Sequence, residues 1–143
     1  NILLDLQNEL HKTIIFITHD LDEALKIGDR IAILRDGSMV QDSDPQEIIM
    51  NPADEYVSDF IKDINRARVI QAKSIMTPTN SKSSGATVSE EMVLEDILQI
   101  MSEAPSKPVT IENPKGKITG RIEMMNLIEG MKRPKSLGTN ITG

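Results

Sequence analysis

The chain has 143 residues, of which 38% are hydrophobic and 27% charged, as in a globular protein, and no apolar run approaches the roughly 20 residues that cross a bilayer. The net charge of −6, with one Tyr and two Phe, disfavours a nucleic-acid partner, which would require clustered basic and stacking side chains. The absence of Cys excludes disulfides, thiolate catalysis and cysteine-based zinc sites, and two His residues make a histidine metal cluster improbable, so no metal ligands are assigned.

The first predicted elements are a helix and a buried strand. Residues 1–12 are expected to form an amphipathic helix whose apolar face contains Ile2, Leu3, Leu6 and Leu10. Residues 13–18 (TIIFIT) are β-branched or aromatic throughout, which is typical of a strand covered on both faces in a parallel sheet. A helix followed by such a strand predicts an α/β fold.

A second helix is predicted directly after this strand. Asp20 can cap its N-terminus, Glu23 can complete an acidic capping box, and Gly28 can end it. Asp20 is therefore interpreted as a helix cap, which explains an aspartate at that position without a catalytic role.

A hairpin and two more helices follow. Residues 30–35 and 38–41 are predicted to pair, because Asp36-Gly37 between them supplies the positive φ angles of a tight turn. Each later helix is expected to start with a capping side chain before a proline, at Asp44-Pro45 and at Asn51-Pro52. The second of these helices has an apolar face made of Tyr56, Val57, Phe60, Ile61 and Ile64.

Residues 65–73 have weak periodicity and local positive charge, and they are interpreted as a linker. They would separate a first domain, residues 1–64, from a second, residues 74–132, with a flexible tail at 133–143. The second domain is predicted to be a β-α-β-β-α unit. Its strands are expected at 86–88, 108–111 and 117–122, and its helices around Leu94 to Met101 and at 124–131.

The first domain resembles the C-terminal third of an ATP-binding cassette (ABC) subunit, a P-loop NTPase. The resemblance rests on an ordered set of motifs: Thr18-His19-Asp20, Glu23-Ala24, Asp29-Arg30, Asp36-Gly37, Pro45 and Asn51-Pro52. The segments HDLDEALKIGDRIAI and NPADEYVSDFI are most similar to importers for glycine betaine, proline and related quaternary amines. The second domain resembles a single cystathionine-β-synthase (CBS) type motif, an appendage of this importer subfamily.

His19 is the predicted catalytic residue. It follows a buried strand, at the edge where open α/β sheets bind ligands, and a neutral imidazole there can contact a terminal phosphate and an attacking water. The resemblance implies this role, because the cassette family has a histidine at the matching position of its switch loop. His11 is interpreted as structural.

The resemblance also implies ATP and Mg²⁺ as cofactors of a longer parent protein. The chain contains no G-x-x-x-x-G-K-[ST] phosphate loop, no glycine-rich signature segment and no hydrophobic strand ending in Asp-Glu, so by itself it is expected neither to bind ATP tightly nor to hydrolyse it. The expected partners are a second copy, an integral-membrane permease and, indirectly, a solute-binding protein. No secretory signal is visible, and the expected location is cytoplasmic, on the inner face of the membrane.

Two residues of the CBS-type unit are candidate ligand contacts. CBS motifs that bind adenosine nucleotides have a Ser or Thr and then an Asp where this chain has Glu123 and Asn126. The Glu123 carboxylate would repel phosphates unless Arg121 neutralises it, so nucleotide binding is disfavoured. A homodimerising surface is preferred over a sensor of ligand or ionic strength.

Two alternative functions stay open at this stage. One is a non-catalytic regulatory module that binds a nucleotide such as cyclic di-AMP, and the other is a decayed gene fragment. ATP hydrolysis by the longer protein would separate the importer subunit from both.

Overall fold

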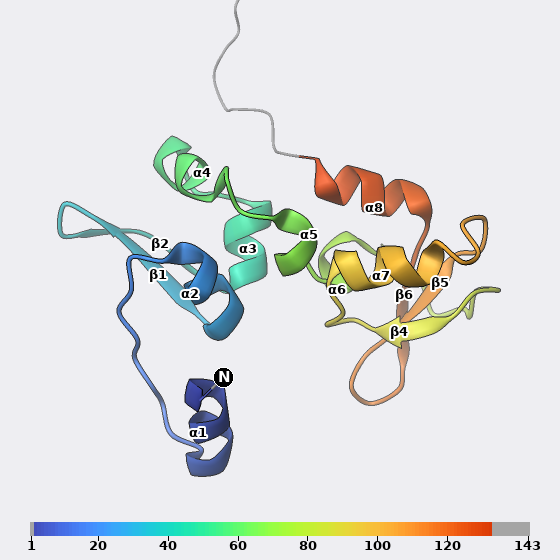
Figure 1. Ribbon diagram of the computed structural model, residues 1–143, viewed down its shortest axis with the longest axis horizontal. Coiled ribbons are helices and arrows are strands. Elements are labelled where there is room, and N and C mark those ends of the chain that lie inside the picture. The colour runs from blue at the N-terminus through green and yellow to red at the C-terminus, as the bar shows by residue number, and fades with distance from the viewer. Residues whose placement is uncertain (1, 133–143) are drawn as a thin grey trace, which may run out of the picture.

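The computed structural model describes residues 2–132, and the expected tail at 133–143 lies outside the described residues. Helix α1 (Ile2–Leu10) is followed by α2 (Leu21–Ile27), the strands β1 (Ile31–Arg35) and β2 (Ser38–Ser43), and the helices α3 (Pro45–Met50) and α4 (Glu55–Ile61) (Figure 1). The remainder contains α5 (Arg66–Val69), α6 (Ala72–Ile75), β3 (Thr77–Pro78), β4 (Thr87–Ser89), α7 (Leu94–Met101), β5 (Val109–Glu112), β6 (Ile118–Ile122) and α8 (Met124–Met131). The chain is thus a mixed α/β protein with two small sheets.

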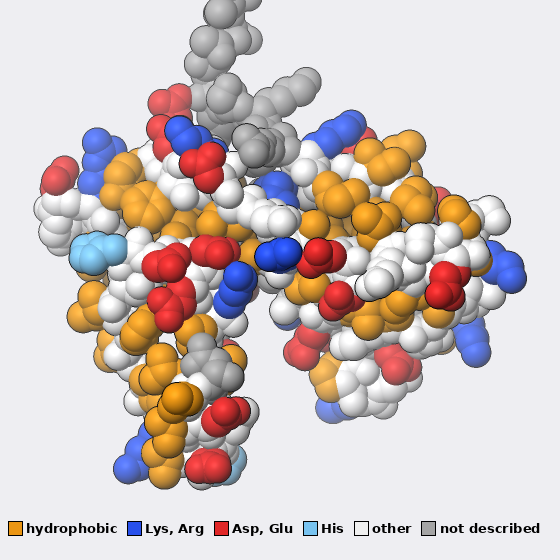
Figure 2. Space-filling model, in the orientation of Figure 1, with side chains coloured by type: hydrophobic (Ala, Val, Ile, Leu, Met, Phe, Trp, Pro, Cys, Tyr) orange, Lys and Arg blue, Asp and Glu red, His pale blue; other side chains and the backbone are white. Residues whose placement is uncertain are grey.

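The predicted helix at the start is confirmed, but the strand predicted at residues 13–18 is wrong. These residues have no regular secondary structure, because no strand of the described chain lies beside them to complete a hydrogen-bonded ladder. Ile15 and Ile17 are consequently 87% and 89% exposed. Helix α1 is amphipathic, and none of its described residues is fully buried. Figure 2 shows apolar side chains along the surface of this part of the molecule.

The hairpin forms as expected. Strands β1 and β2 pair antiparallel, and both turn residues have positive φ, 51° at Asp36 and 78° at Gly37. Ile31 and Ile33 on β1 point into the core. The second strand is longer than predicted and continues to Ser43, next to the cap of α3.

Helix α3 begins as predicted, with the Asp44 side chain accepting the Glu47 N–H at 2.9 Å and Pro45 in the first turn. The predicted start of the next helix at Asn51-Pro52 is wrong. Asn51 instead ends α3, and α4 begins at Glu55, because the Asp54 carboxylate accepts the Val57 N–H at 2.9 Å.

Residues 65–73, expected to be a linker, fold into α5 and the first half of α6. Val69, Ile70 and Ala72 within this segment are buried. Figure 1 shows α5 between α3 on one side and α7 and α8 on the other. The segment therefore packs against both halves of the chain, and the division into domains at this point stays a prediction.

The second half has the predicted β-α-β-β-α order. Its sheet has the strand order β3-β6-β5-β4, with β4 parallel to β5 and the other pairs antiparallel. The short strand β3 was not predicted as such. Helices α7 and α8 pack on one another, and Leu94, Ile97 and Leu127 are fully buried between the helices and the sheet.

The buried apolar residues form one cluster that runs through both halves. It includes Ile48 and Val57 from the first half and Ile111 and Ile122 from the second. Across residues 2–132, no helix is long and apolar enough to cross a membrane.

Candidate functional site

His19 lies at the junction between the irregular segment and α2, and its side chain is exposed. The Asp20 carboxylate accepts the Glu23 N–H at 3.2 Å and caps α2, as predicted. In the predicted capping box, the Glu23 side chain would accept the Asp20 N–H. The Asp20 N–H donates instead to Thr18 Oγ1, at 2.9 Å. The residues before and after His19, Thr18 and Asp20, are therefore held by hydrogen bonds. The exposed imidazole between them is accessible to a ligand or to a second protein surface.

His11 lies at the other end of the irregular segment. Its backbone has φ of 49° and its N–H donates to Gln7 O at 2.9 Å, which ends α1. The structural interpretation of His11 agrees with this position.

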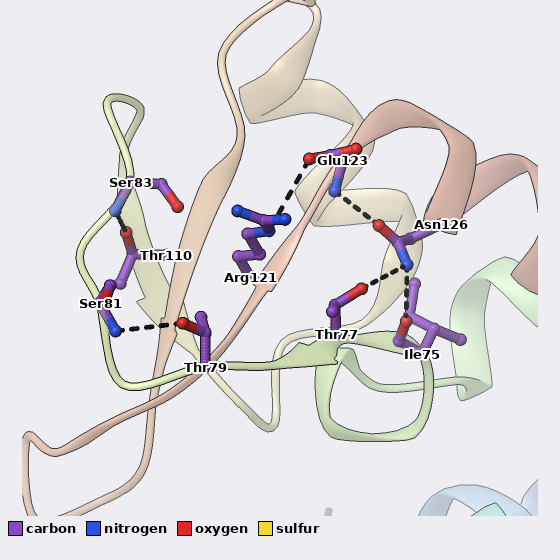
Figure 3. Close-up of polar contacts among 9 residues, drawn as sticks. All are labelled: Ile75, Thr77, Thr79, Ser81, Ser83, Thr110, Arg121, Glu123 and Asn126. Carbon is purple, nitrogen blue, oxygen red and sulfur yellow. Dashed lines mark hydrogen bonds and ion pairs between the residues drawn. The ribbon is translucent and has the colours of Figure 1, made fainter.

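Glu123 and Asn126 lie together at the start of α8. The Glu123 N–H donates to Asn126 Oδ1 at 2.8 Å, and Asn126 Nδ2 donates to Ile75 O at 3.2 Å and to Thr77 Oγ1 at 3.4 Å (Figure 3). The Asn126 amide thus joins α8 to the entry segment of the sheet. Because its donor and acceptor atoms already have protein partners, a ribose would have to displace them.

The Glu123 carboxylate faces a cation of its own chain. Arg121 Nε lies 3.7 Å from Glu123 Oε1, and Figure 3 shows the two side chains directed toward each other. Arg121 is the nearby cation that was predicted to offset Glu123 if any did, and the structure brings the two together. Both side chains are about half exposed, so the pair contributes little to stability.

Two neighbouring hollows lie where the halves meet. One, of about 440 Å³, is bordered by Thr77, Glu123 and Asn126, and the other, of about 320 Å³, by Asp44, Glu47 and Lys73. Met50 and Ser74 border both hollows, which are open to solvent and are together called the groove.

Gln46 connects the two halves beside this groove. Its Nε2 donates to Val69 O at 2.8 Å, and its Oε1 accepts from Gln71 N at 2.9 Å and Ser74 Oγ at 2.7 Å. One side chain of α3 thereby satisfies three polar groups of residues 69–74. Sequence reasoning missed Gln46, because a glutamine after a helix-starting proline has no distinguishing local pattern.

Arg66 makes a second connection between the halves. Its Nη1 donates to Ile49 O and its Nε to Gly130 O, both at 3.2 Å. These carbonyls lie in the last turns of α3 and α8, where the helix dipoles favour a cation. Burial lowers the pKa of Arg66 below its ordinary value, because desolvation disfavours the charged form. The sequence indicates only the positive charge of this segment, not these two contacts.

Within residues 2–132, no group of three His, Asp or Glu side chains is placed to hold a metal ion. His19 is an exposed imidazole that fits a contact to a phosphate oxygen, and by itself it supplies one such contact.

Known proteins resemble this chain along most of its length. It is 61% identical over 74 residues to the glycine betaine/carnitine transport ATP-binding protein GbuA of Listeria monocytogenes, which covers 52% of the chain and 19% of that protein. It is 40% identical over 127 residues to the trimethylamine N-oxide transport system ATP-binding protein TmoW of Pelagibacter ubique, covering 87% of the chain and 37% of that protein. With the glycine betaine/carnitine/choline transport ATP-binding protein OpuCA of Bacillus subtilis it shares 33% identity over 135 residues, covering 93% of the chain and 35% of that protein.

These matches show that the chain is homologous to transport ATP-binding proteins. More particularly, these relatives are named as ATP-binding proteins for the transport of glycine betaine, carnitine and choline, in agreement with the resemblance found in the motifs around His19. The chain spans between about a fifth and about two fifths of the length of these relatives. No protein-family profile matches the chain.

Proposed function

We propose that this chain is part of the ATP-hydrolysing subunit of an ABC importer for quaternary amines or similar osmoprotectants. The observation that carries the proposal is the 40% identity to a trimethylamine N-oxide transport ATP-binding protein over 127 residues, or 87% of the chain. The relatives are named for glycine betaine, carnitine, choline and trimethylamine N-oxide, which are small amines or amine oxides with methylated nitrogen. The proposed substrates belong to this chemical class, and proline, which has no methylated nitrogen, is proposed as a further osmoprotectant substrate.

In this proposal His19 acts in the complete subunit with MgATP bound. MgATP supplies the phosphoryl group that is transferred to water. The His19 imidazole, in its neutral form, donates a hydrogen bond toward the terminal phosphate and accepts one from the attacking water, so it positions the water and stabilises developing charge. The exposure of His19 and the hydrogen bonds on either side of it support this assignment.

The exposed apolar segment supports the view that a larger sheet surrounds residues 13–17 in the complete subunit. Ile15 and Ile17 are almost fully exposed here, although the segment has the composition of a buried strand. We infer that the complete subunit pairs with a second copy and drives a membrane permease from the cytoplasmic face, with a solute-binding protein as an indirect partner.

We further propose that residues 74–132 are a CBS-type unit that pairs with another copy. The strand and helix order supports the CBS-type assignment. Saturation of Asn126 by its own chain and the Arg121–Glu123 pair favour a pairing surface over a nucleotide site. Met125 on α8 is 61% exposed and is a candidate contact.

Uptake measurements test the transport function. In cells whose only osmoprotectant uptake route is the complete transporter, labelled glycine betaine should accumulate with the wild-type subunit and not with His19→Ala, while uptake of leucine by other carriers is unchanged. Wild-type cells that accumulate none of glycine betaine, carnitine, choline, proline or trimethylamine N-oxide would refute the proposed substrate class.

Sedimentation equilibrium of the 143-residue chain tests the pairing surface. Met125→Glu should shift the chain toward monomer, whereas Met39→Glu, at a hairpin side chain with a similar exposure of 59%, should not. Equal effects of the two substitutions would argue against pairing through α8.

A further inference from the structure

The turn that carries His19 depends on two successive hydrogen bonds. Thr18 Oγ1 accepts the Asp20 N–H at 2.9 Å, and Asp20 Oδ1 accepts the Glu23 N–H at 3.2 Å. The first bond spans His19, and the second fixes the residue after it to the first turn of α2. The backbone on both sides of His19 is therefore held, although the segment before Thr18 has no regular structure.

The Thr18 hydroxyl accepts the backbone N–H of Asp20, the residue that caps α2. An N-cap residue has a backbone N–H that a side chain at the third helical position can accept in a capping box. Here the N–H of Asp20 donates to the hydroxyl of Thr18 instead. This choice fixes the backbone ahead of the helix, where His19 lies, as well as the helix start itself.

The bond matters because the His19 side chain is exposed. An exposed side chain has few packing contacts to orient it, so its direction is set mainly by its own backbone. Holding one residue in a single backbone conformation costs conformational entropy. A turn that is already hydrogen-bonded meets this cost in folding, before any phosphate is bound.

We propose that Thr18 is a positioning residue for His19: its hydroxyl holds the turn that aims the imidazole at the reacting phosphate. The inference rests on the proposed ATP-hydrolysing function. A β-branched residue without a hydroxyl, such as valine, keeps the shape and the extended preference at this position and loses only the acceptor. Serine keeps the acceptor and loses a methyl group.

The local part of the inference is tested by amide hydrogen exchange in the 143-residue chain. The Asp20 amide should exchange at least several-fold faster in Thr18→Val than in wild type, and Thr18→Ser should restore protection. The Glu47 amide, held by the Asp44 cap, serves as the internal reference and should not change. Unaltered exchange at Asp20 in Thr18→Val would overturn the inference.

The functional part is tested by phosphate release from the complete subunit. Thr18→Val should lower kcat by roughly tenfold or more, since small displacements of a catalytic group have effects of this size, with the KM for ATP and the melting temperature close to wild type. Thr18→Ser should recover kcat to within about twofold of wild type. Full activity of Thr18→Val beside an inactive His19→Ala would overturn the role of Thr18 alone, whereas full activity of His19→Ala would overturn the proposed role of His19.

Discussion

Arg66 offers the sharpest test of how the two halves are joined. Its guanidinium donates to Ile49 O in the last turn of α3 and to Gly130 O in the last turn of α8. Arg66→Ala removes both donors and leaves two carbonyls in a partly buried place without this partner. We expect the substitution to destabilise the chain through the contact between its halves.

The magnitude follows from the two hydrogen bonds. A hydrogen bond to a charged group contributes about 1.5–3 kcal/mol, which for two bonds of good geometry gives about 3–6 kcal/mol. Both distances are 3.2 Å, at the long end of the usual range, and burial of the guanidinium, which lowers the pKa of Arg66, offsets part of the gain. A loss of about 2 kcal/mol in the free energy of unfolding is therefore expected.

Urea unfolding followed by far-ultraviolet circular dichroism measures this loss as a lower transition midpoint with an unchanged slope. Arg68→Ala is the matched control. Arg68 lies two residues further along α5, and its ion pair with Glu95, at 3.4 Å, is more than half exposed on both sides, so its removal should cost about 0.5 kcal/mol or less. Equal, small losses in the two variants would refute the assignment of Arg66 as a connection between α3 and α8.

Two further substitutions test other contacts. Gln46→Ala should lower the free energy of unfolding by about 2 kcal/mol, because three polar groups lose their partner. Gln99→Ala, on the exposed side of α7, is the control and should lower it by less than about 0.5 kcal/mol. Equal losses of the two variants in urea unfolding would contradict this prediction. Gly85→Ala would place a Cβ in steric overlap with Pro108 O, a backbone atom, so we expect a loss of about 2 kcal/mol in the same measurement. Ser84→Ala beside it should change stability by about 0.5 kcal/mol at most, and a harmless Gly85→Ala would show that the loop can move away from Pro108.

Features that depend on near neighbours could be predicted from the sequence. The caps at Asp20 and Asp44 bond to amides three residues away, and the Asp36-Gly37 turn requires only the φ angles of its own residues. The cap of α4 was assigned to Asn51, although Asp54 also precedes helical residues, and proline patterns alone do not decide between two such candidates.

Features that depend on distant partners could not be predicted. A strand at residues 13–18 requires neighbouring strands, whereas the composition of this segment indicates only that its side chains suit a buried position. The bonds of Arg66 reach carbonyls 17 and 64 residues away, and those of Gln46 reach 23 to 28 residues. The choice of His19 as a candidate rests on a local motif and stays a prediction, whereas the bond from the Asp20 N–H to Thr18 Oγ1 could be found only in the structure.

The role of His19 is tested most directly by phosphate release from the complete ATP-binding subunit. We predict that His19→Ala lowers turnover on the order of 100-fold or more while ATP binding, measured separately, is retained. His11→Asn, at the chain's other histidine and with a residue that tolerates its positive φ, should release phosphate at the wild-type rate. Wild-type turnover in His19→Ala would contradict the account.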